Sequence, residues 1–264
     1  MERSTLEREA HRIESLLRLC GVGEAALDVG ARAGEISAHL TAQFERIVAL
    51  DLVRPTVKHP KIACVEGDAT KLPFPDRSFD VVLCSEMLEH LSLSDLSIAA
   101  REIARVTRSR LIVGVPYKQD IRLGRTTCGE CGTVNPPWGH VNVFDESALR
   151  ALFPSLQCDV VEFVGTSSGR TNWLSASLLD FAGNPYGTYD QQERCIRCGA
   201  LVGNPKPRNV SQKVATKTAV VLQRLQTYMS TETPNWIHMR LETKAAAHMV
   251  DRRPHPRAAA QNSV

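Results

Sequence analysis

Four of the eight cysteines form two copies of one short pattern. Residues 128–132 and 195–199 both read C-x-x-C-G. Two thiolates three residues apart on a tight turn present half of a tetrahedral metal site, and the glycine permits the turn. A thioredoxin-like redox motif needs only one such pair, so it explains the repetition less well. The spacing therefore predicts one structural zinc ion held by Cys128, Cys131, Cys195 and Cys198.

A second group of residues could bind a nucleoside. An apolar run ends in LDVGARAGE, so Gly30 and Gly34 would turn the chain sharply into a helix whose free amide groups favour a ligand. Asp51 ends the next apolar run, where an acid can accept two hydrogen bonds from vicinal ribose hydroxyls. Arg32 stands at the middle glycine of the dinucleotide fingerprint G-x-G-x-x-G, so that fingerprint is absent.

The elements that must position these residues alternate in type. Helical patterns cover 34–44 and 92–106, and apolar runs lie before the first at 25–29, between the two at 46–51, 61–67 and 79–84, and after the second at 110–116. Such alternation is typical of βαβ units that form a doubly wound, mostly parallel sheet. After residue 116 we expect an insertion, a short helix over 145–153, a last clear strand over 158–164 and a helix over 210–229. The fold class is therefore α/β.

The two cysteine pairs lie far apart in the chain and suggest four parts. We expect an N-terminal helix (1–24), a core (25–165) with the first zinc knuckle at 117–140, a lid segment (166–205) with the second knuckle, and a basic C-terminal helix and tail (206–264). Zinc would then join an insertion after the fifth strand to a segment beyond the sixth. In that position it would clamp the lid segment over the substrate side.

Composition and charge limit the class of protein. The chain has 264 residues, of which 43% are hydrophobic, and this excludes a disordered or fibrous protein. It holds no apolar run long enough to span a membrane, and its first residues predict a charged amphipathic helix, so we expect a cytoplasmic protein. Residues 201–264 carry 10 Lys and Arg against 3 Asp and Glu. This basic region is either a solvated terminus or a contact for phosphate, an anionic glycan or a membrane surface.

One segment resembles a known family. Residues 66–91 read EGDATKLPFPDRSFDVVLCSEMLEHL, and with LDVGARAG and VALD upstream they resemble the class I S-adenosylmethionine-dependent methyltransferases, in the group that acts on quinones and small molecules. The resemblance covers roughly residues 20–116. It implies a Rossmann-like methyltransferase fold, here with a zinc-binding insertion and a C-terminal helical extension, and S-adenosylmethionine as the cofactor.

The resemblance also implies a cofactor site. In these enzymes the position of Asp28 faces the methionine amino group, while the two glycines line the turn and Asp51 holds the ribose. Two pairs complete the predicted set: the adenine edge is read at Asp68 and Ala69, and the methionine moiety lies beside Ser85 and Glu86. Arg32 departs from the glycine that the family usually has there.

With this cofactor, the protein mainly has to align a nucleophile with the methyl group. A hydroxyl acceptor benefits from a base, and the candidates are His140 in WGHVNVF and His90 in SEMLEHL. Each could instead be a structural histidine. We predict O-methylation of a small molecule or saccharide.

Two other functions stay open. An RNA or protein methyltransferase could hold its macromolecule with the zinc module and the basic tail, and a non-catalytic scaffold could bind a nucleoside only. Asn135-Pro136-Pro137-Trp138 resembles a motif of amino methylases that act on nucleobases. That motif follows the fourth strand, a place that residues 84–87 occupy here. We therefore interpret the Asn-Pro-Pro-Trp segment as a rigid turn.

Overall fold

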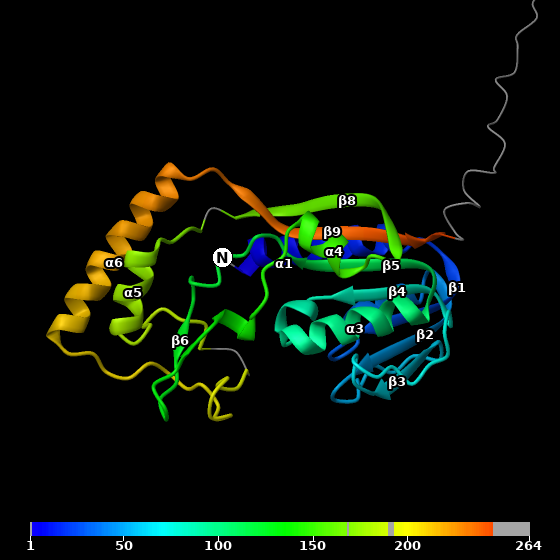
Figure 1. Ribbon diagram of the computed structural model, residues 1–264, viewed down its shortest axis with the longest axis horizontal. Helices are drawn as coiled ribbons and strands as arrows, with labels where there is room; N and C mark the ends of the chain where they lie inside the picture. Colours follow the sequence, from blue (N-terminus) through cyan, green and yellow to red (C-terminus); the bar gives the residue numbers. More distant parts are fainter. Residues whose placement is uncertain (1, 168, 190–192, 245–264) are drawn as a thin grey trace, which may run out of the picture.

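The computed structural model describes residues 2–167, 169–189 and 193–244. Its central feature is a seven-stranded sheet with the order β3-β2-β1-β4-β5-β9-β8 (Figure 1). These strands are β1 (Gly23–Val29), β2 (Phe44–Asp51), β3 (Ile62–Glu66), β4 (Phe79–Ser85), β5 (Thr107–Pro116), β8 (Leu156–Ser167) and β9 (Thr233–Thr243).

The first five strands are parallel, so their carboxyl ends meet at one edge of the sheet. β9 is antiparallel both to β5 and to β8, and β8 therefore runs in the same direction as β5. The strand order reverses between β1 and β4. Open α/β sheets bind ligands at the carboxyl edge of such a switch point.

Helices cover both faces of the sheet. They are α1 (Glu2–Cys20), α2 (Glu35–Leu40), α3 (Leu93–Val106) and α4 (Glu146–Leu152), together with the short 3-10 helix η1 (Leu88–His90). Alternate residues of each buried strand enter opposite core layers: Val82 packs in the layer that includes Ile103 of α3, while Val81 and Leu83 pack in the layer that includes Leu16 of α1. A period of two residues is what a strand buried on both faces requires.

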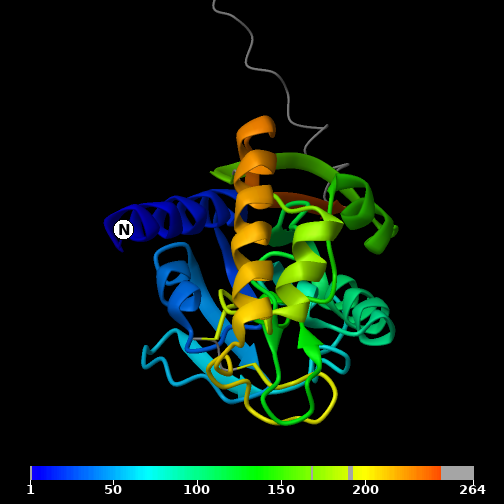
Figure 2. The same cartoon turned by 90° about the vertical axis from the view of Figure 1, so that its left-hand side faces the viewer.

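A second group of elements lies beyond one end of the sheet (Figures 1 and 2). It contains the hairpin of β6 (Thr126–Thr127) and β7 (Val134–Asn135), the 3-10 helix η2 (Pro137–Gly139), α5 (Trp173–Phe181) and α6 (Val210–Met229). Asn172 and Asn209 begin α5 and α6 with capping boxes, in which the asparagine oxygen accepts a hydrogen bond from a first-turn amide. Figure 2 shows the two helices side by side.

The predicted fold class is confirmed, and the helices over 145–153 and 210–229 occur almost as expected. The helix expected over 34–44 is shorter, because strand β2 begins at Phe44. The prediction that 158–164 is the last strand was wrong, since β9 follows α6 and lies inside the sheet. The predicted tail at 245–264 lies outside the described residues. Among the residues described, no helix combines the length and the hydropathy needed to cross a membrane.

Candidate functional site

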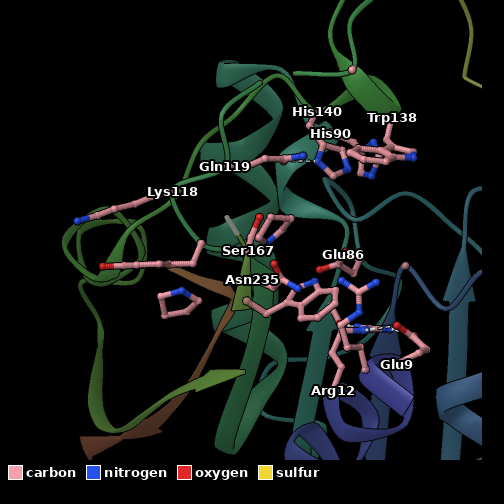
Figure 3. A pocket seen from close by; sticks show the side chains of 18 of the residues that line it. Glu9, Arg12, Glu86, His90, Lys118, Gln119, Trp138, His140, Ser167 and Asn235 are labelled. Carbon is pink, nitrogen blue, oxygen red and sulfur yellow. Dashed lines mark hydrogen bonds and ion pairs between the residues drawn. The ribbon is translucent and has the colours of Figure 1, made fainter. Parts of the chain in front are cut away.

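A cavity of about 800 Å³ lies at the carboxyl edge of the parallel strands (Figure 3). Its wall combines the turn after β1, the end of β4, one face of α1, the segment after β5, η2 and one end of the β8–β9 pair, where β8 ends and β9 begins. This volume is typical of sites for drug-sized ligands and cofactors. Parts of the chain from residue 8 to residue 236 therefore meet around one space.

The turn after β1 forms one side of the cavity. Gly30 has φ +80°, and a Cβ atom there would lie 2.9 Å from the side chain of Met87. Only glycine fits this conformation and this close approach without strain. Asp28 precedes it, is buried, and accepts a hydrogen bond of 2.6 Å from the Ser37 hydroxyl. Burial raises the pKa of Asp28 to about 6.

Asp51 and Arg32 fix the far side of the same turn. The amide of Arg32 donates a hydrogen bond of 2.8 Å to the Asp51 carboxylate. Arg32 has φ +49°, an unfavourable conformation for a residue with a side chain, and its side chain lines the cavity. Gly34 has φ +88°, and a Cβ there would meet Val57 at 2.4 Å. Both glycines that flank Arg32 thus have positive φ angles and leave no room for a side chain.

Four of the eight predicted cofactor residues line the cavity and four do not. The lining residues are Asp28, Gly30, Ser85 and Glu86, and the others are Gly34, Asp51, Asp68 and Ala69. Asp68 is exposed and accepts hydrogen bonds from the amide and hydroxyl of Thr70. These hydrogen bonds lower its pKa.

Helix α1 closes the end of β4. Arg12 is buried, donates a hydrogen bond of 2.8 Å to the Ser85 hydroxyl and forms an ion pair with Glu9. Glu86 follows Ser85 with φ +55° and lines the cavity. Burial raises the pKa of Glu86 to about 7, although the positive charge of Arg12 partly offsets this effect. The sequence predicted an amphipathic helix here but not its contact with the site.

Arg12→Met is expected to lower the free energy of unfolding by about 1–3 kcal/mol, because Ser85 loses a charged donor and Glu86 loses a nearby cation. The ion pair with Glu9 adds little to this free energy, because the side chain of Glu9 is 42% exposed and solvent screens the charges. Urea unfolding measures it. Arg18→Met is the matched control, since Arg18 pairs with Glu162 at the surface with 58% of its side chain exposed. A loss no larger than the control's would contradict a role of Arg12 in holding β4.

His90 and His140 are neighbours in the cavity wall. Their ring centroids are 4.6 Å apart and their planes are nearly perpendicular. His140 is buried, and its Nδ1 is 2.6 Å from the side-chain oxygen of Gln119, so Nδ1 carries the proton of this hydrogen bond (Figure 3). Burial and the neighbouring His90 lower the pKa of His140 to about 4, and burial also lowers the pKa of His90. Both rings are therefore neutral near pH 7.

Glu89 lies behind the two histidines, and the sequence did not mark it as a site residue. It is 1% exposed, and neither oxygen of its carboxylate has a hydrogen-bond partner in the described part of the chain. Burial and the negative charge of Glu86 raise the pKa of Glu89 to about 8. A buried carboxylate without a partner is costly, so it calls for a functional explanation.

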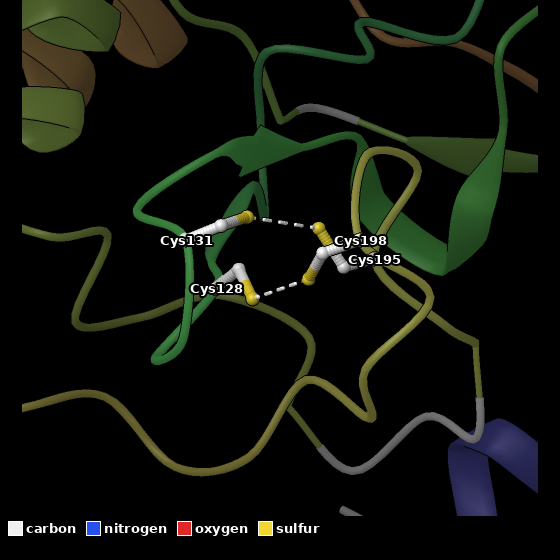
Figure 4. Close-up of side chains that lie close together, drawn as sticks. All are labelled: Cys128, Cys131, Cys195 and Cys198. Atoms are coloured by element: carbon white, nitrogen blue, oxygen red, sulfur yellow. Dashed lines mark hydrogen bonds between the residues drawn. The ribbon is translucent and has the colours of Figure 1, made fainter.

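The four cysteines of the two C-x-x-C-G segments come together outside the cavity (Figure 4). Their sulfur atoms all lie within 4.8 Å of one another, with 3.7 Å between Cys128 and Cys198 and 3.6 Å between Cys131 and Cys195. Zinc–sulfur bonds of about 2.3 Å in a tetrahedron place sulfur atoms about 3.8 Å apart. The donor set and its spacing therefore fit a zinc ion.

The two cysteine turns repeat the same hydrogen bonds. Cys128 donates its amide to the carbonyl of Thr133, and Cys195 donates its amide to that of Ala200. In each turn the glycine amide returns to the first cysteine's carbonyl, and both glycines have φ +71°. Each turn is thus a complete knuckle.

Asn135 links the knuckles and resolves the meaning of the Asn-Pro-Pro-Trp segment. Its side-chain oxygen accepts a hydrogen bond of 2.9 Å from the amide of Ile196, while its amide group donates to the carbonyl of Thr133. Asn135 is buried and does not line the cavity. Pro136 and Pro137 lead into a short 3-10 helix, as expected of a rigid turn, and only Trp138 reaches the cavity.

Known proteins resemble parts of this chain. Demethylmenaquinone methyltransferase of Beutenbergia cavernae is 39% identical over 98 residues, which are 34% of this chain and 40% of the relative. Malonyl-[acyl-carrier protein] O-methyltransferase of Erwinia billingiae is 37% identical over 107 residues, with 35% and 42% covered. The chain thus spans about two-fifths of the length of these relatives.

The fold resemblance extends further than the sequence resemblance. The crystal structure of YcgJ from Bacillus subtilis matches with a TM-score of 0.52 at 16% identity, covering 89% of this chain and 98% of the other. Residues 27–112 match the family described as "Methyltransferase domain". This segment begins within β1 and ends within β5, and it includes the turn after β1 and the Glu89-His90 pair. The family resemblance predicted from the sequence is confirmed: residues 27–112 of this chain match the methyltransferase-domain family.

Proposed function

We propose that this chain transfers a methyl group from S-adenosylmethionine to a hydroxyl group of a small molecule. The observation that supports this most is the single cavity in which the methyltransferase turn at Gly30 and the His90–His140 pair share one space. One end could hold the cofactor and the other the acceptor. Such alignment is the main requirement for direct transfer.

The residues around the turn fit the cofactor's chemistry. When bound, S-adenosylmethionine supplies a sulfonium methyl group, so a C–O bond to the acceptor forms as the C–S bond breaks and the electron pair stays on sulfur. Asp28 and Glu86 are acidic groups on the cavity wall, suited to an ammonium group. Asp51 would hold the ribose beside the turn, and Asp68 with Ala69 would read adenine. The acceptor hydroxyl would lie beside the histidine pair when it loses its proton.

The class of acceptor follows from the relatives and from the cavity. By their names, the two relatives methylate a quinone precursor and an acyl group on a carrier protein, and the second is an O-methyltransferase. The cavity here is lined by aromatic and charged side chains, including Trp138, Trp236 and Arg32. We infer an acceptor with a planar or ring-shaped apolar part, and a saccharide is the second choice. A cytoplasmic location stays a prediction.

We also infer that the four cysteines bind one structural zinc ion. The four sulfur atoms would fill all four coordination positions of a tetrahedral zinc ion, so none would stay open for a substrate. Cys131 Sγ lies 3.2 Å from the Thr133 hydroxyl, and the hydrogen bonds with the side chain and backbone of Thr133 lower the pKa of Cys131 to about 6, which favours the thiolate that a metal needs. Zinc would tie residues 128–135 to residues 193–202 and thereby hold Trp138 and His140 at the cavity.

Asp51→Ala is expected to weaken the binding of S-adenosylhomocysteine at least about tenfold. The substitution removes a charged acceptor of up to two ribose hydrogen bonds, each worth about 1.5–3 kcal/mol. It also frees the Arg32 amide that shapes the turn. Calorimetric titration measures the affinity. Asp68→Ala should have a smaller effect, and an unchanged affinity in Asp51→Ala would contradict the ribose assignment.

The proposed activity is tested by incubating the protein with methyl-labelled S-adenosylmethionine and fractionated small molecules of a cell extract. We expect label in a molecule that gains a methoxy group. Label in RNA or protein instead would favour a macromolecular acceptor. If calorimetry shows binding of neither S-adenosylmethionine nor S-adenosylhomocysteine, the proposal is overturned, and a non-catalytic protein that does not bind this cofactor is favoured.

A further inference from the structure

Glu89, His90 and His140 form a second cluster of metal-binding groups in the described part of the chain. Each offers one ligand atom, and the three atoms lie within 4.8 Å of one another. The cluster is separate from the four cysteines. Two imidazole nitrogens and one carboxylate oxygen are a ligand set that binds divalent transition metals and leaves other coordination positions open.

The cluster lacks the partners that its groups would need without a metal. Both carboxylate oxygens of Glu89 are buried and without a hydrogen-bond partner among the described residues. In His140, Nδ1 is occupied by Gln119, so Nε2 is the nitrogen left to bind an ion. A histidine that ligates a metal commonly donates its other N–H to an oxygen in this way, which fixes the ring.

The backbone holds the two halves of the cluster together although they are 50 residues apart. The amides of Val141 and Asn142 both donate to the carbonyl of Glu89, at 2.8 and 3.1 Å. The side chain of Asn142 donates to the carbonyls of Leu88 and Leu91, at 3.0 and 2.6 Å. These four hydrogen bonds tie the segment after η2 to η1, so the ligand geometry is fixed before any ion arrives.

We propose that Glu89, His90 and His140 bind one divalent transition-metal ion, and that this ion binds the hydroxyl oxygen of the methyl acceptor. The two histidines line the cavity and Glu89 lies behind them, so the open coordination positions face the cavity. A metal ion stabilises the deprotonated form of a bound hydroxyl, and the released proton passes to water. The inference on the acceptor rests on the proposed methyl transfer, whereas the metal site itself does not.

Metal binding is tested on the whole chain after it has been loaded with zinc, which we infer binds at the four cysteines. Manganese(II) is titrated in and followed by calorimetry and by the loss of the free-ion electron paramagnetic resonance signal. We expect one further ion per chain. Cobalt(II) at this site should show no thiolate-to-cobalt charge-transfer band, because no cysteine belongs to the cluster. Such a band in the zinc-loaded protein would place the ion at the cysteines and overturn the assignment.

Three variants identify the ligands. Glu89→Gln and His140→Asn should weaken manganese binding by more than about 100-fold, and Gln119→Ala should weaken it by about 10- to 100-fold through the loss of ring orientation. His39→Asn is the control, because His39 is an exposed histidine on α2, and it should bind as the wild type does. Equal affinity in wild type and Glu89→Gln would refute the site.

Thermal unfolding separates a metal ligand from a packing residue. Glu89→Gln replaces a buried carboxyl group that has no hydrogen-bond partner among the described residues by an amide of almost the same volume, so in metal-free buffer its melting temperature should stay close to that of the wild type. Added manganese should raise the melting temperature of the wild type only. A lower melting temperature for the variant, together with no effect of manganese on the wild type, would show that Glu89 is structural.

Cofactor affinity, measured on the same samples, distinguishes this inference from the proposed function. If S-adenosylhomocysteine binds and manganese does not, the metal site is refuted while the methyltransferase proposal stands. If manganese binds at the three residues and the cofactor does not, the metal site stands while the proposed function fails. If both bind, the proposed acceptor contact requires manganese affinity to change when the methylated product is added, and an unchanged affinity would refute that contact.

Discussion

Cys195→Ser is expected to remove the zinc ion and to open the contact between the two knuckles. Cys195 is buried in a small cluster with Cys128 and Val202, so little apolar packing replaces the metal when it is lost. Structural zinc contributes on the order of 10 kcal/mol in small zinc modules. Elemental analysis should fall from one zinc per chain to none, and limited proteolysis should cut within residues 117–140 and 193–205.

The sheet should survive this substitution, because its two core layers contain none of the four cysteines. Affinity for S-adenosylhomocysteine should therefore stay within a few-fold of the wild type, while methyl transfer should fall. Cys158→Ser is the control, since Cys158 lies on β8 outside the cluster and should leave the zinc content at one. Wild-type protein that is kept reduced and free of chelators, yet contains no zinc, would refute the metal assignment.

His140→Ala is expected to lower the turnover number by about 100-fold or more, with the affinity for S-adenosylhomocysteine unchanged. His140 lines the cavity at the place that we propose for the acceptor, where a base or a metal ligand would contribute to removal of the hydroxyl proton. The turn at Gly30 does not depend on it. Steady-state kinetics with the acceptor identified by the labelling experiment measures the turnover number, and calorimetry measures the affinity for S-adenosylhomocysteine.

The same variant also tests the structural alternative. If His140 only packs in the wall, its replacement should lower the melting temperature and leave the turnover of the folded fraction near normal. His39→Ala controls for the loss of an imidazole elsewhere, and we expect it to match the wild type in both measurements. A turnover within threefold of the wild type would refute a catalytic role.

The sequence predicts features that depend on local spacing. Two thiolates at positions i and i+3 cannot complete a tetrahedron, so the pairs at 128–131 and 195–198 had to meet each other despite their separation. The turn at Gly30 could be predicted for a similar reason, since Asp28, Gly30 and Gly34 lie within one strand–turn–helix unit. The surroundings of Glu89 could not be predicted, because they depend on residues 141 and 142, which are distant in sequence and donate hydrogen bonds to its backbone carbonyl. The same holds for Arg12, whose partner Ser85 is 73 residues away.

Strand β9 was missed although its pattern is that of a strand. The apolar residues Ile237, Met239 and Leu241 alternate with the polar residues His238 and Arg240, a period of two residues in the sequence, although His238 is buried as well. The segment follows a long helix and lies within a basic region, and those features favour an interpretation as tail. Pairing with β5 and β8 overrides them, because the inserted strand covers two exposed edges at once.

The position of β9 also determines the order in which this chain can fold during synthesis. Residues 23–116 contain all five parallel strands, so this part of the chain can collapse as soon as it leaves the ribosome. β8 is made next but has no neighbour, because β9, which separates it from β5, is synthesised only after α6. Until residue 243 emerges, β5 and β8 both present unpaired edges that can aggregate, and a chaperone would have the greatest effect in that interval.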